Sequence, residues 1–235
     1  NTQHVGEGVS GGREAALAAA IAGAAGGAVK VIGDAMPSRY ASDHSVTDAK
    51  KLAANLSIEL REIPIDTVHK AFESSLHFSD LAGENLQARI RAVLLMGISN
   101  TDNALLLSTG NKSEIAVGYS TMYGDSAGGF APIKDLFKSD VWRVSAWLNN
   151  RGNGELIPEN SITKEPSAEL RPDQIDTDSL PDYKILDQVL ALLIEQCATI
   201  EKVIASGHPR QLAEKIGGRV RASKWQRSQG AIGTK

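Results

Sequence analysis

Small and polar residues follow an apolar run near the middle of the chain, where residues 105–125 read LLLSTGNKSEIAVGYSTMYGD. The run predicts a strand that ends at a loop, and the loop in turn opens a helix. In open α/β sheets, ligands bind in the crevice outside the carboxyl ends of the strands. Thr109, Gly110, Asn111 and Glu114 therefore stand where a ligand would bind.

A second candidate loop, Ser10-Gly11-Gly12, precedes an alanine-rich helix. Glycines let backbone N–H groups approach a phosphate closely, and the start of a helix adds partial positive charge. A tight turn without a ligand is the other interpretation, because the loop lacks the GK[ST] of a P-loop and the third glycine of a dinucleotide fingerprint. Nucleotide phosphates would bring Mg²⁺, which takes one or two carboxylates. Glu14 and Glu114 are the candidates.

The expected elements alternate along the first 150 residues. Apolar periodicity predicts strands at 28–32, 58–63 and 103–107, helices at 15–26, 65–78, 85–99 and 135–149, and a helix capped by Ser42 or Asp43 that runs to Leu56. This alternation predicts an α/β fold with a doubly wound parallel sheet and helices on both faces.

The two ends of the chain fit this pattern less well. Residues 1–8 would make a poor central strand by propensity, and no strand is expected after residue 134. A long loop at 151–181 is followed by two or three helices within 182–218, so the C-terminal part is expected to be helical. We treat residues 1–235 as one domain, since no low-complexity linker divides them.

Charge and composition exclude several classes of protein. The net charge of -3 gives no basic field for a nucleic acid, and no apolar run predicts a membrane span. The single cysteine, Cys197, excludes an internal disulfide and suits the cytoplasm. Eight carboxylates within 155–182 and seven basic residues within 210–235 are either solvated surface or, respectively, a mobile lid and phosphate contacts.

Several motifs, taken in order, resemble the NAD synthetases, and most closely the synthetase domain of the glutamine-dependent members. They are SGG followed by an acidic and a small residue, MPSRYASDHS, ENLQARIR, STGNKSE, YGD, SAELRPDQ and DSLPDY. The resemblance covers residues 10–229. The SGG loop is shared by other N-type ATP pyrophosphatases, whereas ENLQARIR and GNKSEIAVGYSTMYGD are more particular.

The resemblance implies an adenine nucleotide alpha hydrolase-like fold, usually in a homodimer. The implied reaction is the ATP-dependent amidation of nicotinic acid adenine dinucleotide to NAD. ATP adenylates the nicotinate carboxylate and releases pyrophosphate, and ammonia then displaces AMP. Such a ligase needs positioning and charge neutralisation more than a side-chain nucleophile. The sequence holds no amidase domain, so the ammonia would be free or come from a glutamine amidase partner.

The resemblance also implies roles for individual residues, with no catalytic nucleophile among them. The implied ATP-binding residues are Ser10, Gly11, Gly12, Glu14, Ala15, Arg39, Ser45, Thr109, Lys138 and Ser167. The implied dinucleotide-binding residues are Asn85, Arg89 and Asp125, and the implied Mg²⁺ ligands are Glu14 and Glu114.

The chain departs from the family pattern in the SGG loop. Arg13 replaces a usually apolar residue and is expected to face solvent or to clash with the core, Glu14 replaces aspartate, and Ala15 replaces serine. These changes predict reduced activity. Two other interpretations stay open: a nucleotide-binding homologue without turnover, and another ATP pyrophosphatase that forms an amide through an acyl adenylate.

Overall fold

A single six-stranded sheet with every pair of neighbours parallel forms the centre of the computed structural model. The structure describes residues 4–9, 12–151, 154–172 and 174–234, with only the backbone at Asp43. The strands are β1 (His4–Gly8), β2 (Val31–Ala35), β3 (Glu59–Glu62), β4 (Ala104–Leu107), β5 (Phe130–Ala131) and β6 (Ile232–Gly233). Their order is β3-β2-β1-β4-β5-β6, so the predicted doubly wound sheet is confirmed. The chain adds β2 and β3 on one side of β1 and β4 to β6 on the other, so the strand order reverses between β1 and β4.

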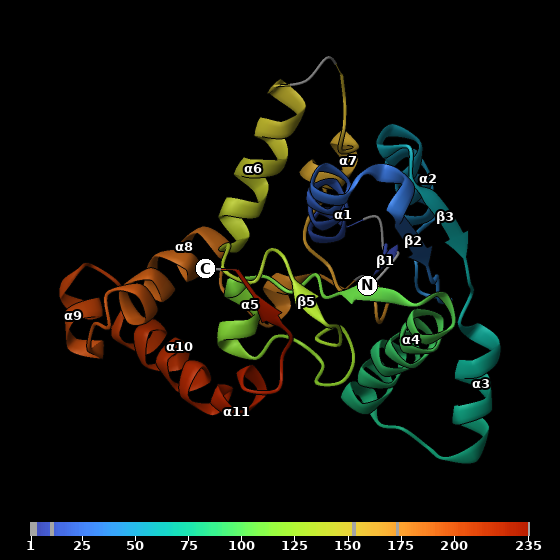
Figure 1. Ribbon diagram of the computed structural model, residues 1–235. Helices are drawn as coiled ribbons and strands as arrows, with labels where there is room; N and C mark the ends of the chain where they lie inside the picture. Colours follow the sequence, from blue (N-terminus) through green and yellow to red (C-terminus); the bar gives the residue numbers. More distant parts are fainter. Residues whose placement is uncertain (1–3, 10–11, 152–153, 173, 235) are drawn as a thin grey trace.

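Helices cover both faces of this sheet. They are α1 (Arg13–Gly26), α2 (Asp43–Leu56), α3 (Asp66–Ser75), α4 (Asp80–Asp102), α5 (Lys112–Val117), α6 (Lys138–Arg151), α7 (Glu159–Thr163), α8 (Tyr183–Leu190), α9 (Ile200–Ala205), α10 (Arg210–Ala222) and α11 (Lys224–Arg227). Figure 1 shows α1, α2, α6 and α7 on one side of the sheet, α3 and α4 on the other, and α8 to α11 as a lobe beside α5.

The N-terminal strand corrects one expectation. HVGEG is β1, which lies in the middle of the sheet and pairs with β2 and β4 along its length. Its weak propensity is overcome by these two partners and by close packing, since a Cβ at Gly8 would come within 3.1 Å of Leu95 on α4. Pairing on both sides therefore outweighs the composition of the strand.

Other boundaries also differ from the prediction. Ala28–Lys30 is a 3-10 turn, so the second strand begins at Val31. A strand does exist after residue 134, because β6 pairs with β5 over two residues. The predicted loop at 151–181 contains α7, and α4 is longer than predicted at both ends. In the described residues, no helix is long and apolar enough to cross a membrane.

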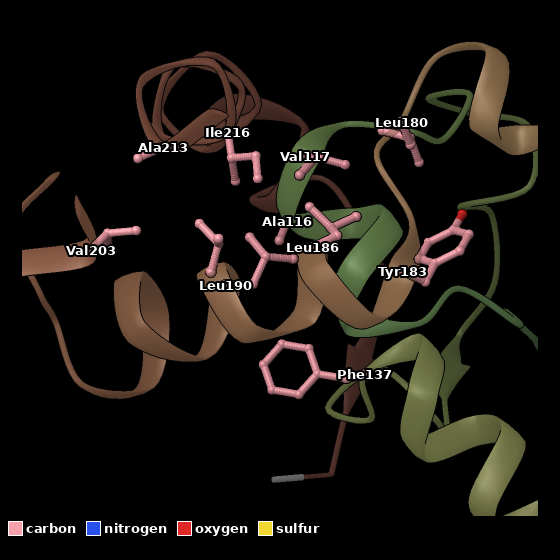
Figure 2. Packing of buried hydrophobic residues seen from close by; sticks show 11 residues of the cluster. Ala116, Val117, Phe137, Leu180, Tyr183, Leu186, Leu190, Val203, Ala213 and Ile216 are labelled. Carbon is pink, nitrogen blue, oxygen red and sulfur yellow. The ribbon is translucent and has the colours of Figure 1, made fainter. Parts of the chain in front are cut away.

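Two packed regions hold the elements that flank the strand ends. The alanines of α1 from Ala15 to Ala20 are buried and let this helix pack closely on the sheet. In the C-terminal lobe, Figure 2 shows Leu186 and Leu190 of α8 and Ile216 of α10 directed toward Ala116 of α5. The short helix α5 is therefore held from outside the sheet by the helical lobe.

Candidate functional site

A cavity of about 570 Å³ opens at the carboxyl ends of β1, β2 and β4. Open parallel sheets bind their ligands at this position. The lining includes ten predicted site residues: Gly12, Glu14, Ala15, Ser45, Asn85, Thr109, Glu114, Asp125, Lys138 and Ser167. Arg39 and Arg89 are not in the lining, and Ser10 and Gly11 lie outside the described residues.

The most strongly charged part of the cavity is a buried ion cluster. The Lys138 ammonium lies 2.7 Å from a carboxylate oxygen of Glu14, 2.6 Å from one of Glu114 and 3.9 Å from one of Asp176. Glu14, Glu114 and Lys138 lie in the first turns of α1, α5 and α6, respectively, and all three helices begin at this edge of the sheet. Three carboxylates therefore face one ammonium in this part of the cavity.

The pKa values of the cluster follow from burial and from mutual pairing. Burial raises the pKa of Glu114 to about 7, although the charge of Lys138 opposes the rise. Burial acts in the same direction on Glu14, but Lys138 outweighs it and the pKa of Glu14 falls below its ordinary value. Burial alone would lower the pKa of Lys138, yet Glu114 and Glu14 raise it overall. Lys138 is therefore a permanent cation of the site.

A buried serine and aspartate position this cluster, and sequence reasoning missed both. Ser113 on α5 donates a hydrogen bond to Asp187 on α8 and accepts one of 2.8 Å from the backbone N–H of Lys138. Asp187 also accepts a 2.9 Å bond from the N–H of Ser139. The pair joins α5, α6 and α8, so it fixes Glu114 and Lys138 relative to each other. The available signal was the polar Asp187 on the apolar face of a predicted helix.

The last residue of the loop before α5, Asn111, joins the loop to the helix. Asn111 is fully buried as the N-cap of α5, where its side-chain oxygen accepts a 3.0 Å bond from the N–H of Glu114. Thr109 and Gly110 precede it and line the cavity. The GNKSE sequence thus places the Glu114 carboxylate through a helix cap.

The predicted dinucleotide residues divide into two groups. Asn85 of α4 accepts a 2.6 Å bond from the Thr121 hydroxyl, and Asp125 accepts a 2.6 Å bond from the Thr121 N–H. Burial raises the pKa of Asp125 to about 6. Arg89 instead lies on the exposed surface and donates a 3.2 Å bond to the carbonyl of Met122. The structure brings Asn85 and Asp125 together and leaves Arg89 beside the loop.

Of the two predicted ATP residues that follow β2, Arg39 and Ser45, one lines the cavity and the other does not. Arg39 pairs with Glu73 at 3.1 Å and with Asp66, away from the cavity. Ser45, in the first turn of α2, donates to Glu169 at 2.7 Å. Only Ser45 therefore faces the site.

We call residues 164–172 and 174–180 the covering segment, because many of them line the cavity. Gln87 of α4 donates a 2.8 Å bond to the carbonyl of Leu170. Asp176 accepts bonds from the hydroxyls of Tyr119 at 3.2 Å and Tyr183 at 2.8 Å. Ser167, the predicted nucleotide contact of this segment, is placed in the cavity by these attachments.

Arg13 corrects a second expectation, since it neither faces solvent nor clashes with the core. Only 4% of the residue is exposed, and its guanidinium lies 4.7 Å from the centre of the Trp142 ring. Its nitrogens donate to backbone carbonyls at the end of α7. A gap between α1, α6 and α7 accommodates the charged group by supplying hydrogen-bond acceptors.

Comparisons with known proteins agree with this geometry. The family model described as NAD synthase matches residues 1–230. The chain belongs to the NAD synthase family. A glutamine-dependent NAD(+) synthetase from Thermotoga maritima is 45% identical over 234 residues, which are 97% of this chain and 41% of that protein. The chain spans about two fifths of the length of the curated NAD synthetases it matches.

Two solved structures of NAD synthetases share the fold. One is the glutamine-dependent NAD+ synthetase of Acinetobacter baumannii in complex with ADP, with 38% identity, a TM-score of 0.69, and coverage of 100% of this chain and 43% of that one. The other is the NH3-dependent NAD synthetase of Campylobacter jejuni, with 30% identity, a TM-score of 0.78, and coverage of 96% and 87%. The predicted family and fold are therefore confirmed.

Proposed function

We propose that this chain is a synthetase domain that converts nicotinic acid adenine dinucleotide to NAD with ATP and ammonia. The observation that carries the proposal is the meeting of Glu14, Glu114 and Lys138 in one cavity. Glu14 and Glu114 follow the two loops that the sequence singled out, and Lys138 is the first residue of α6. The names of the relatives support the reaction, and the ADP complex of the A. baumannii synthetase supports nucleotide binding.

The reaction balances without a protein nucleophile. A nicotinate carboxylate oxygen bonds to the α-phosphorus of ATP while the bond to pyrophosphate breaks. Ammonia then attacks the acyl carbon, loses a proton, and AMP leaves with the former carboxylate oxygen. Both steps need the reactants to be held in line and their charge to be neutralised. Lys138 and the backbone around Gly12 are the groups of this chain that would serve the phosphates.

The carboxylates of Glu14 and Glu114 fit a magnesium ion. Both already converge on one cation, the ammonium of Lys138, at 2.7 and 2.6 Å. Within the described residues, no group of three or more His, Cys, Asp or Glu side chains could hold a metal alone. Mg²⁺ typically takes one or two carboxylates together with phosphate oxygens and water, so the ion would arrive with ATP. Bound there, it would neutralise charge on the phosphates.

The remaining cavity residues serve the two substrates in this proposal. Asn85 and Asp125, which meet at Thr121, bind the dinucleotide. Thr109, Ser45 and Ser167, which all line the cavity, contact ATP. The predicted roles of Ser10 and Gly11 fall outside the described residues and stay predictions, as do the roles of Arg39 and Arg89.

We also propose a homodimer that uses the exposed side of α4. Val93 is 71% exposed and Met96 43% exposed on this side. Exposed apolar side chains that lie together on a helix are typical of an interface. The predicted cytoplasmic location and a separate glutamine amidase as the ammonia source remain proposals of the same kind.

Formation of NAD and AMP tests the function. We expect equal amounts of both from nicotinic acid adenine dinucleotide, ATP, Mg²⁺ and ammonia, and more of both after Glu14→Asp and Ala15→Ser restore the usual loop. No product from either form would contradict the catalytic proposal.

Two further measurements separate the alternatives. Titration calorimetry that shows ATP and Mg²⁺ binding without turnover would favour a nucleotide-binding homologue. Pyrophosphate release that depends on a different carboxylate substrate would favour another ATP pyrophosphatase. Replacing ammonia by glutamine, with and without an added amidase, tests the ammonia source.

A further inference from the structure

Arg13 links two parts of the site that are about 150 positions apart in the sequence. It is the first residue of α1, directly after Gly12 and before Glu14. Its Nε donates to the carbonyl of Ser161 at 3.2 Å, and one Nη donates to the carbonyl of Ile162 at 2.8 Å and also to that of Lys164. One side chain thus runs from the glycine loop to the end of α7.

The three acceptors belong to the C-terminal turn of α7, where backbone carbonyls have no partner within the helix. A guanidinium has five N–H donors in a rigid fork, and positive charge is favourable at this end of a helix. Arg13 therefore acts as a C-cap supplied by another helix. Lys164, the last of the three residues, is also the first residue of the covering segment.

The attachment is built from several sides. The guanidinium is stacked on Trp142 of α6, and burial lowers the pKa of Arg13 although the carboxylates of Glu14 and Asp176 oppose that shift. Asp176 lies in the covering segment and Glu14 in the ion cluster, so charges from both parts of the site face the same guanidinium. A lysine could not supply this fork of donors.

We propose that Arg13 is a positioning residue that fixes the start of the covering segment against α1 and so holds Ser167 and Glu169 over the nucleotide cavity. This inference rests on the proposed function for the identity of the nucleotide. The segment has other attachments, since Gln87 donates to the carbonyl of Leu170, the Asp176 N–H donates to the carbonyl of Pro166, and the Lys164 ammonium donates to the Ser42 hydroxyl. Arg13 differs from these in holding the backbone carbonyl of Lys164, the first residue of the segment, against α1.

Positioning of this kind predicts a particular kinetic effect. A segment that covers ATP contacts it in the ground state and in the transition state alike, and loss of such uniform binding raises KM while kcat stays nearly unchanged. Replacement of Arg13 by methionine keeps an unbranched chain against Trp142 but removes every donor. We expect Arg13→Met to raise the KM for ATP about tenfold, with kcat within about twofold of the parent.

Hydrogen exchange gives a second readout that does not depend on catalysis. In Arg13→Met, amides of residues 164–172 should exchange about tenfold faster, because the carbonyl of Lys164 loses the donor that fixes the first residue of the segment. Amides of β2 and β4 should be unchanged. Arg13→Lys should lie between the two, since it keeps the charge but loses the fork. The matched control is Arg143→Met on α6, whose side chain is 80% exposed.

The outcomes separate this inference from the proposed function. Failure of the parent chain to form NAD would contradict the proposed function. In that case hydrogen exchange and the ATP affinity measured by calorimetry would still test the role of Arg13. Unchanged exchange in the covering segment and unchanged KM would overturn the inference, as would faster exchange spread equally over β2 and β4. If Arg13→Met does not fold, parent-like exchange and KM in Arg13→Lys would overturn it.

Discussion

Glu7 lies in the central strand with its side chain wholly buried, and neither of its carboxylate oxygens has a hydrogen-bond partner among the described residues. Burial raises its pKa well above the ordinary value of 4.5, so folding favours the protonated form of this carboxyl. No pairing charge contributes to this shift. The substitution of Glu7 by valine, a β-branched residue suited to a strand, removes both the unpaired oxygens and the titration.

The expected gain has two parts. A buried polar group without a partner costs about 1–3 kcal/mol, and valine removes that cost at every pH. The second part comes from the unfolded chain, where Glu7 ionises near its ordinary pKa, whereas in the folded chain burial raises that pKa. The stability contributed by this raised pKa is fully present at low pH and is lost as the pH rises, by about 1.4 kcal/mol per unit. Above the ordinary pKa of Glu7, the parent should therefore lose stability relative to Glu7→Val as the pH rises toward the raised pKa of the folded state.

Urea unfolding at pH 5, 6, 7 and 8 measures both parts. Glu7→Val should be more stable than the parent throughout, with a difference that widens as the pH rises. Glu7→Gln should lose the pH dependence but keep the cost of unpaired polar atoms. Glu159→Gln, which replaces an exposed carboxylate, is the control. The reasoning is refuted if the parent and Glu7→Gln share one pH profile, or if Glu7→Val is the less stable protein at pH 7.

Three other substitutions test the site and the proposed interface. Lys138→Met should lower the free energy of unfolding by about 3–5 kcal/mol, because it leaves buried Glu14 and Glu114 without their cation; urea unfolding measures this, and parent-like stability would contradict it. Asp187→Asn should lower kcat more than it raises the KM for ATP, because it loosens Glu114 and Lys138; steady-state kinetics decide. Val93→Asp should convert the proposed dimer to a monomer in light scattering, and an unchanged mass would remove α4 from the interface.

Local sequence signals predicted the elements that are decided locally. The helix expected after Ser42 is α2, and the Ser42 hydroxyl caps it by accepting a 3.3 Å bond from the N–H of Ser45. The helix predicted at 135–149 corresponds to α6, and the strand predicted at 103–107 corresponds to β4 within one residue. Capping and periodicity are properties of neighbouring residues, so they can be recognised without the rest of the chain.

The features that sequence reasoning missed depend on distant partners. β1 is central because β2 and β4 form backbone hydrogen bonds with it on both sides, and the residues HVGEG alone do not indicate this pairing. Arg13 is buried because the end of α7 offers it three carbonyls from residues about 150 positions away. The role of the Ser113 and Asp187 pair likewise needs α8 to pack on α5. Such contacts arise only after the chain has folded.

The structure predicts that the two changes at Glu14 and Ala15, beside the SGG loop, affect NAD formation to different extents. Glu14 is one methylene longer than the usual aspartate, yet its carboxylate reaches the same ammonium as Glu114. Ala15 is different, because it lines the cavity and supplies no hydrogen-bond donor in place of the serine hydroxyl. Ala15→Ser alone should therefore raise the rate of NAD formation more than Glu14→Asp alone. A larger gain from Glu14→Asp would show instead that carboxylate length limits the metal site.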